Sequence, residues 1–168
     1  MANVIRLRKI GLGAIVALGI VAAPGTALAT TDVPYAVTGI EYAATPTVGW
    51  FAGVAVAADD FGTWKATVVH DPLPTIVGTS SGITGGTVTL DGQIRDMAGA
   101  INGGTLTLLT TSSCGRQTFR VLAHLTLTSG GTGDADAAML LTHYRLLFLG
   151  HCITYAATVQ GSVTFHLS

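Results

Sequence analysis

The 168-residue sequence contains little charge, since only 10% of its residues are Asp, Glu, Lys or Arg. So low a charge is not typical of a disordered tail, a coiled coil or a charge-laced helical bundle. Three of the eight Lys and Arg lie before residue 30, which leaves five against nine Asp and Glu, a balance of 5 − 9 = −4. A mildly acidic domain without a basic cluster is not expected to bind nucleic acid.

Metal ligands and paired carboxylates are also scarce. Glu41 is the only glutamate, and the five histidines form neither H-x-H nor H-x-x-x-H spacing. A zinc site needs three or four convergent ligands, so we expect no metal and no cofactor. A glycosidase needs two opposed carboxylates, whereas Asp59 and Asp60 adjoin in a predicted turn, where we expect them to face solvent.

Only one long apolar run is present, at residues 10–22, between a basic start and the small residues Ala27 and Ala29. This order is typical of a secretory signal peptide that is cleaved after Ala29. The run is shorter than the roughly 20 residues of a membrane span. We therefore expect residues 1–29 to be removed and residues 30–168 to form one secreted domain, extracellular or periplasmic, without a stable membrane span; an uncleaved anchor is the alternative.

The chain has only two cysteines, Cys114 and Cys152. An even count in an oxidising compartment favours a disulfide over a metal or catalytic pair, with two free thiols as the alternative. Two strand spacings amount to roughly 9.6 Å, which exceeds the limit of about 7 Å between bridged Cα atoms. We therefore expect residues 112–115 to form a loop that folds across a strand end.

Helix signals are almost absent after residue 30, and apolar residues instead alternate with polar ones. In residues 116–128, for example, Phe119 and Leu125 share one face while Arg120 and His124 share the other. Eight or nine strands joined by short turns predict an all-β domain, an antiparallel up-and-down or Greek-key β-barrel of about eight strands, with a two-sheet β-sandwich as the alternative. Besides a strand before the last turn, strands are expected near residues 35–42, 48–57, 62–70, 82–90, 93–98, 103–111, 116–128 and 153–167.

Two segments repeat each other, since Ile83–Leu90 recurs eighteen positions later as Ile101–Leu108. Two copies are too few for a solenoid. We interpret them as two similar strands, each bent at its Gly-Gly pair. The dipeptide Asp91-Gly92 predicts a two-residue hairpin turn.

The register of the last three strands can be derived from their turns. A turn at Gly150-His151 and a pairing of Thr128 with Ala135 give one apolar face that runs across all three strands. Tyr144 lies on that apolar face in this register.

The same register gathers cationic side chains on the opposite, polar face. Arg120 faces His143, and Arg145 lies one step along the strand. Guanidinium groups of this kind bind carboxylate or phosphate. If the polar face is simply the outer surface of the sheet, the same residues are ordinary hydrated surface.

An accessible lumen would be the expected ligand site, because small barrels hold one ligand there. The candidate ligand-binding residues are therefore Arg120, His143 and Arg145 together with Trp64 and Tyr144. Trp50 and Tyr155 are further aromatic candidates for the lining.

Gly78, Ser80 and Gly82 fit the pattern G-x-S-x-G of a hydrolase nucleophile. That chemistry needs a strand before the serine and a helix after it. Here strand-forming residues follow, so we interpret the segment as a turn.

Four motifs succeed one another along the chain: Gly62-Thr63-Trp64, Ser113-Cys114-Gly115, Thr142-His143-Tyr144-Arg145 and Cys152-Ile153-Thr154-Tyr155. Over residues 35–167 this succession resembles a group of secreted bacterial proteins that are expected to be β-rich and have no assigned function. The resemblance implies a β-rich fold and a cysteine pair, and implies nothing about activity.

The sequence thus predicts an exported, non-catalytic β-barrel that binds a small ligand or serves at the cell surface. One alternative is a small secreted serine hydrolase that uses Ser80. Another is an outer-membrane β-barrel, which the mean hydropathy of +0.57 suggests, although aromatic girdles are not evident.

Overall fold

The computed structural model describes residues 30–168, so the predicted signal peptide lies outside the described residues. The described chain is built from eight antiparallel strands, which confirms the all-β prediction. The strands are β1 (Thr31–Ala44), β2 (Val48–Val56), β3 (Phe61–His70), β4 (Ser80–Gly92), β5 (Asp96–Thr111), β6 (Arg116–Ser129), β7 (Gly133–Phe148) and β8 (His151–Leu167). Within residues 30–168 no helix has the length and apolar character needed to cross a membrane.

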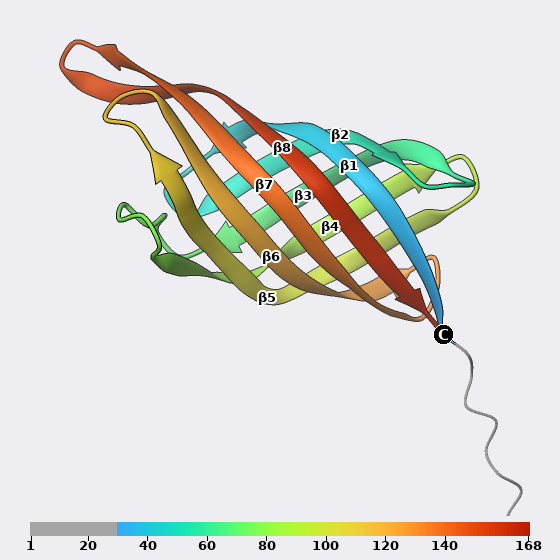
Figure 1. The fold of residues 1–168 in the computed structure, drawn as a ribbon. Helices are drawn as coiled ribbons and strands as arrows, with labels where there is room; N and C mark the ends of the chain where they lie inside the picture. The colour runs from blue at the N-terminus through green and yellow to red at the C-terminus, as the bar shows by residue number, and fades with distance from the viewer. Residues whose placement is uncertain (1–29) are drawn as a thin grey trace, which may run out of the picture.

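The sheet closes on itself as an up-and-down barrel (Figure 1). Each strand pairs with the next one in sequence, and β8 pairs with β1 from Thr31↔Leu167 to Ile40↔Thr158. The alternatives of a Greek-key order and a two-sheet sandwich are therefore wrong. Closure leaves no free sheet edge along the barrel wall, which removes the edges on which neighbouring chains could pair.

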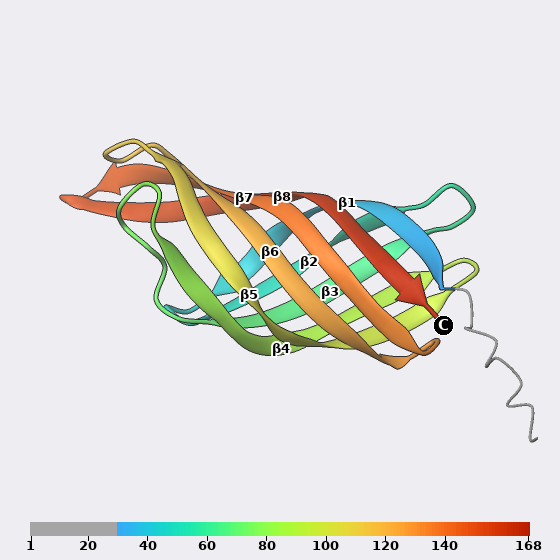
Figure 2. The same ribbon diagram turned by 60° about the horizontal axis from the view of Figure 1, so that its bottom comes forward.

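The barrel has two unlike ends, which Figures 1 and 2 show on the right and the left. The terminus end contains the start of β1, the end of β8 and the hairpins β2–β3, β4–β5 and β6–β7. The ribbon end contains the other four connections. There the β7–β8 hairpin projects beyond the barrel, and residues 145–157 have strand partners only within this hairpin. We call residues 145–157 the ribbon.

Alternation along the strands sends apolar side chains into the lumen and hydroxylated ones to the outside. On β3, for instance, Trp64 is buried while Thr63 is exposed, and on β8 Val159 is buried while Thr158 is exposed. The alternation predicted for residues 116–128 and 153–167 is found on β6 and on residues 157–167 of β8, where the apolar face, which the sequence left unoriented, points into the lumen; Ile153 and Tyr155 are exposed instead. Tyr35, Leu108 and Phe119 are the largest side chains that are fully enclosed.

The two Gly-Gly pairs bend adjacent strands, as predicted from their repeat. Gly86 on β4 and Gly104 on β5 have φ values of 140° and 156°. A Cβ atom at Gly86 would lie 2.1 Å from the carbonyl oxygen of Thr67, so only glycine fits there. The segments predicted near 93–98 and 103–111 prove to be one strand, β5, which passes through its bend without ending.

Two predicted turns are displaced. Asp91 pairs with Asp96, so the β4–β5 turn spans four residues rather than two. Phe148 pairs with His151, so the β7–β8 turn is Leu149-Gly150 rather than Gly150-His151. Leu149 and Gly150 have φ values of 47° and 81°, the left-handed geometry of a tight hairpin.

The register predicted between β6 and β7 is also wrong. Phe119 lies opposite Leu141 rather than Tyr144, and Arg120 lies opposite Leu140 rather than His143. The shift of three residues exchanges the two faces of β7. His143 therefore points into the barrel, and Tyr144 lies on the outward side of the strand.

Candidate functional site

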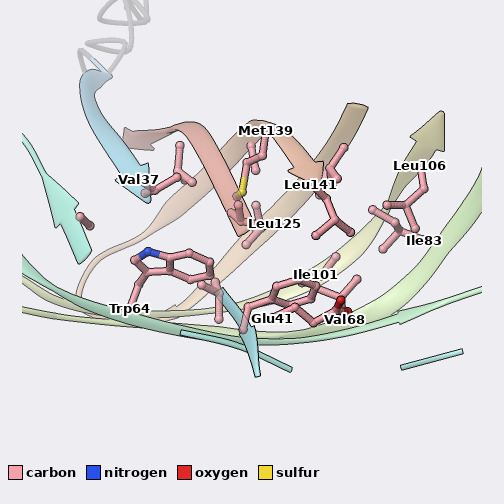
Figure 3. A pocket seen from close by; sticks show the side chains of 18 of the residues that line it. Val37, Glu41, Trp64, Val68, Ile83, Ile101, Leu106, Leu125, Met139 and Leu141 are labelled. Carbon is pink, nitrogen blue, oxygen red and sulfur yellow. The ribbon is translucent and has the colours of Figure 1, made fainter. Parts of the chain in front are cut away.

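A cavity of about 80 Å³ lies inside the barrel. Its wall is almost entirely apolar and draws on every strand, and Figure 3 shows Trp64, Leu125 and Met139 directed into it. The indole N–H of Trp64 donates to the carbonyl oxygens of Thr38 and Val54, both at 3.1 Å, so the ring is fixed in place. The lumen is thus mostly filled by side chains and keeps one small apolar space.

Glu41 contributes a carboxylate to this apolar wall. Its Oε2 lies 2.9 Å from Nε2 of His143, and the two side chains are only 7% and 9% exposed. The contact has the distance of an ion pair, yet Nε2 has no aligned hydrogen-bond partner among the described residues. The His143 ring packs edge-on against Phe119, with ring centroids 5.4 Å apart. A charged group so enclosed is costly unless it is well paired.

Local backbone features place Glu41 in the lumen. The register of β1 against β2 shifts between Glu41 and Ala43, which turns the end of β1. Below the carboxylate lies Gly49, where a Cβ atom would come within 2.6 Å of Oε1 of Glu41. The missing side chain of Gly49 is therefore the space that the carboxylate occupies.

The β3–β4 loop borders the cavity at the ribbon end. Leu73 from this loop packs against the core and lines the cavity, and so does His70 at the end of β3. Nδ1 of His70 lies 2.7 Å from the carbonyl oxygen of Asp71, which fixes the ring. Pro72 and Pro74 flank Leu73 and restrict the loop backbone.

The terminus end of the lumen is closed by a polar network around Asp60. The Tyr35 hydroxyl donates to Oδ2 of Asp60 at 2.7 Å, and backbone N–H groups of Phe61, Ile94 and Arg95 also donate to this carboxylate. The hydrogen bond from Tyr35 lowers the pKa of Asp60. Burial and the contact with Asp60 raise the pKa of Tyr35 to about 12. The prediction that Asp60 faces solvent is wrong, because this residue is buried.

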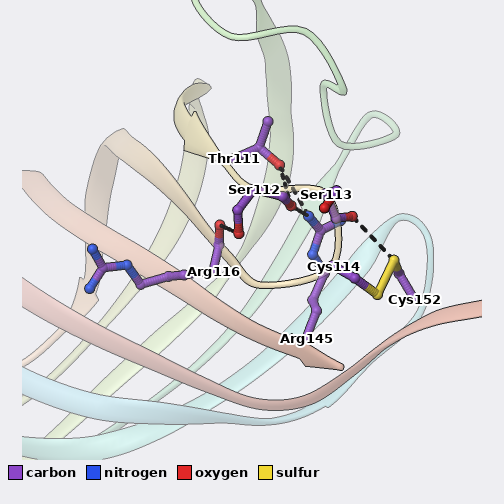
Figure 4. Close-up of a disulfide and its surroundings, with 7 residues drawn as sticks. All are labelled: Thr111, Ser112, Ser113, Cys114, Arg116, Arg145 and Cys152. Carbon is purple, nitrogen blue, oxygen red and sulfur yellow. Dashed lines mark hydrogen bonds between the residues drawn. A yellow bond between two sulfur atoms is a disulfide. The ribbon is translucent and has the colours of Figure 1, made fainter. Parts of the chain in front are cut away.

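The structure does not assemble the predicted cationic cluster. Arg120 is exposed on the outer face of β6, whereas His143 is buried in the lumen. Arg145 holds the β5–β6 loop: its guanidinium donates to the Thr111 hydroxyl at 3.0 Å and to the Ser112 carbonyl at 2.7 Å (Figure 4). Of these three cations, only His143 lies at the lumen.

Among the predicted aromatic residues, Trp64 alone is directed into the cavity. Trp50 and Tyr144 are half-buried on the outward sides of their strands, and Tyr155 is exposed on the ribbon. Trp50 and Tyr144 point outward because Phe51 and His143, the next and the preceding residue in their strands, point inward.

The predicted disulfide is confirmed. Cys114 and Cys152 are bridged, with their Cα atoms 5.4 Å apart (Figure 4). Cys114 lies in the loop between β5 and β6, as the strand-spacing argument required. Together with Arg145, the bridge attaches the ribbon to the rest of the ribbon end.

Ser80 is the first residue of β4, and the chain continues after it as a strand. Its hydroxyl lies 2.7 Å from that of Thr107 on β5. A nucleophile elbow instead needs a helix after the serine. The described residues also contain no group of three His, Cys, Asp or Glu side chains arranged to hold a metal ion.

Glu41 is the site residue that sequence reasoning missed. It is the only glutamate, and it sits in a strand whose apolar residues Tyr35 and Val37 share its parity. A lone carboxylate on an apolar face was the available signal. In comparisons with known proteins, no family model, curated protein or solved structure matches this chain.

Proposed function

We propose that this chain is an exported, non-catalytic barrel whose lumen holds one small, largely apolar molecule through a polar group directed at Glu41. The observation that carries the proposal is the buried carboxylate in the wall of an apolar cavity. Apolar pockets with a few convergent polar groups are the usual form of small-molecule sites. The predicted signal peptide and disulfide support an exported protein.

The size of the cavity limits the ligand. At about 80 Å³ it is far smaller than the roughly 300–1,000 Å³ of sites for drug-sized molecules. An engineered cavity of about 150 Å³ holds benzene. We therefore expect a ligand, or an inserted part of a ligand, of only a few carbon atoms.

The polar group of the ligand is a hydrogen-bond donor, because a carboxylate only accepts. An alkylamine supplies both a donor and a positive charge, and an alkanol supplies a donor alone. Such a donor would stabilise the Glu41 carboxylate, because His143 is the polar side chain that this carboxylate contacts in the otherwise apolar wall. We place the entry at the ribbon end beside Leu73, since the Tyr35–Asp60 network closes the other end.

The distribution of side chains favours this function over the alternatives. Outer-membrane barrels carry apolar residues outside and polar ones inside, whereas here the lumen is apolar and threonines such as Thr63, Thr89 and Thr158 face outward. For a hydrolase, Ser80 lacks the helix that would make it a nucleophile.

The proposal is tested by titrating the exported chain with n-butylamine, n-butanol and n-butane while the indole N–H resonance of Trp64 is followed by NMR. We expect all three to shift it and butylamine to bind most tightly. The Glu41→Gln variant should bind butylamine roughly tenfold more weakly and butane unchanged.

Two variants serve as controls. Ala123→Leu fills the cavity from its wall and should abolish binding of all three probes, whereas Asp71→Asn removes an exposed carboxylate of the ribbon end and should change nothing. If no probe shifts the Trp64 resonance, or if Ala123→Leu binds like the original chain, the lumen is not a binding site.

A further inference from the structure

The ribbon exposes apolar side chains at its tip. Four consecutive residues, Leu146 to Leu149, are all apolar and exposed, with Leu147 at 66% and Leu149 at 83%. Ile153 and Tyr155 on the returning strand are exposed as well. Contiguous exposed apolar surface of this kind marks a contact with a partner or a membrane.

The exposed residues lie on both faces of the ribbon. Successive residues of a strand point to opposite sides, so Leu147 and Phe148 cannot share one face. Residues 145–157 have strand partners only within the β7–β8 hairpin, and residues 146–156 are exposed, so the barrel covers neither face of the tip. A protein surface fits one face of such a hairpin, whereas an interfacial lipid layer surrounds both.

Charge separates strongly along the barrel. Seven of the nine acidic residues lie at or near the terminus end: Asp32, Asp59, Asp60, Asp91, Asp96, Asp134 and Asp136. The ribbon end has the other two, of which Glu41 is enclosed with His143 and only Asp71 is exposed.

Arg95 lies at the terminus end, paired with Asp59, whereas Arg116 and Arg145 lie at the ribbon end. Arg116 is exposed at the start of β6, beside Arg145, and Figure 4 shows its side chain extending away from the disulfide loop. No acidic residue follows Asp136 in the sequence, so the ribbon itself carries none. The apolar tip thus lies beside two arginines, at the end of the barrel that has the fewest exposed acidic residues.

A second apolar segment lies at the same end. Ile76 and Val77 in the β3–β4 loop are exposed, and Figure 2 shows this loop and the ribbon on the same side of the barrel. Two exposed apolar tips with arginines near them are suited to a lipid bilayer. The apolar side chains would contact the acyl chains, and the arginines would contact anionic headgroups.

We infer that the ribbon end docks on a lipid bilayer that contains anionic lipids. Leu147 to Leu149 enter the interfacial layer, where the unpaired backbone edges of the ribbon stay hydrated. Arg116 and Arg145 lie at the depth of the headgroups. A second copy is a poorer partner for this end, because two ribbon ends that met would bring like charges together. The inference rests on surface features alone and is independent of ligand binding in the lumen.

The test is sedimentation of the exported chain with vesicles of phosphatidylcholine, with and without phosphatidylglycerol. We expect binding to the mixed vesicles and weaker binding to phosphatidylcholine alone. The double variant Leu147→Ser/Leu149→Asn should bind roughly tenfold or more weakly to both. Arg116→Gln should lose roughly fivefold on the mixed vesicles only.

The matched control is Val56→Ser/Phe61→Ser, which removes two apolar side chains of the terminus end that are 47% and 48% exposed. It should bind like the original chain, and the thermal melts of all variants should show folded protein. The inference is overturned if mixed vesicles are not bound or if Leu147→Ser/Leu149→Asn binds as well as the original. It is equally overturned if the ribbon variant abolishes only a dimer seen by ultracentrifugation, since a second copy then covers the tip.

Discussion

The barrel encloses one carboxylate near each end, and the two are held very differently. At the terminus end, Asp60 accepts hydrogen bonds from the Tyr35 hydroxyl and from three backbone N–H groups. At the ribbon end, Glu41 meets the ring of His143 at 2.9 Å, and the facing Nε2 has no aligned hydrogen bond among the described residues. Asp60 therefore stabilises the terminus end of the barrel through its hydrogen bonds. Glu41 is instead a hydrogen-bond acceptor held in an apolar space.

The two ends also differ in what keeps their connections together. At the terminus end the β2–β3 and β4–β5 hairpins are joined by Arg95, whose guanidinium meets both oxygens of Asp59 at 2.9 and 2.7 Å. At the ribbon end a covalent bridge joins the β5–β6 loop to the ribbon. The terminus end is thus held together by hydrogen bonds and ion pairs that involve its acidic residues. The ribbon end is held by a disulfide, and its surface carries apolar and cationic side chains.

Removing the bridge should have the largest effect. In the variant Cys114→Ser/Cys152→Ser the unfolded chain is no longer constrained across 38 residues, and we expect the free energy of unfolding to fall by about 4 kcal/mol. Urea denaturation measures it. A loss below about 1 kcal/mol would mean that the hydrogen bonds of Arg145 alone hold the ribbon end.

The next largest effect concerns the terminus end. Tyr35→Phe leaves Asp60 with one hydrogen bond fewer, and we expect a loss of about 1–2 kcal/mol at neutral pH. Because the pKa of Tyr35 is raised to about 12 in the folded chain, the unfolded chain releases this proton first. The part of the stability that is linked to Tyr35 should therefore decline as the pH rises from about 10 to 12, and Tyr35→Phe should lack that part.

Urea denaturation at neutral and alkaline pH measures both changes. The exposed Tyr155 of the ribbon provides the control, since Tyr155→Phe should alter neither quantity. If Tyr35→Phe and Tyr155→Phe changed the free energy of unfolding equally, the Tyr35–Asp60 hydrogen bond would not be what stabilises the terminus end.

Replacing Glu41 together with its partner His143 should have a smaller effect of opposite sign. Glu41→Leu/His143→Leu exchanges a poorly aligned buried pair for apolar side chains in an apolar wall, and we expect stability to rise by about 1 kcal/mol. Asp60→Leu, its counterpart at the terminus end, should instead destabilise the barrel. Thermal and urea unfolding of the two variants give the comparison. A clear loss of stability in the double variant would make the Glu41–His143 contact a structural one, like the network around Asp60.

The smallest effect is expected at the tip of the ribbon. Leu149 adopts a φ of 47° without being glycine, so Leu149→Gly should stabilise the barrel by about 0.5 kcal/mol. Differential scanning calorimetry detects such a change as a small rise in Tm. A fall in Tm would show that the Leu149 side chain contributes to the fold.

Much of the architecture follows from the sequence because alternation on β6 and β8 is unambiguous. Phe119 and Leu125 alternate with charged and hydroxylated residues, so the sequence alone separates the two faces of that strand, although it leaves open which of them lines the lumen. The cysteine bridge followed from the even number of cysteines and the expected oxidising compartment, and the strand spacing predicted the loop that carries Cys114.

The site was harder to predict, because β7 is apolar on both faces. Ala137 and Leu141 point inward while Ala138 and Leu140 point outward, so periodicity does not distinguish the faces. The turn rule then failed at Leu149, since a leucine with positive φ is disfavoured in any local prediction. His143 was consequently assigned to the wrong face, and its contact with Glu41 depends on pairings that only the closed barrel creates.

The seam between β1 and β8 has a consequence for how the chain reaches its native state. Thr31 and Leu167 are partners across 136 residues. The first strand therefore completes its hydrogen bonds only when the last strand is present. Contacts of such long range slow folding. A barrel whose first and last strands pair can close only when both strands are present, so its closure follows the synthesis of β8 rather than accompanying that of β1.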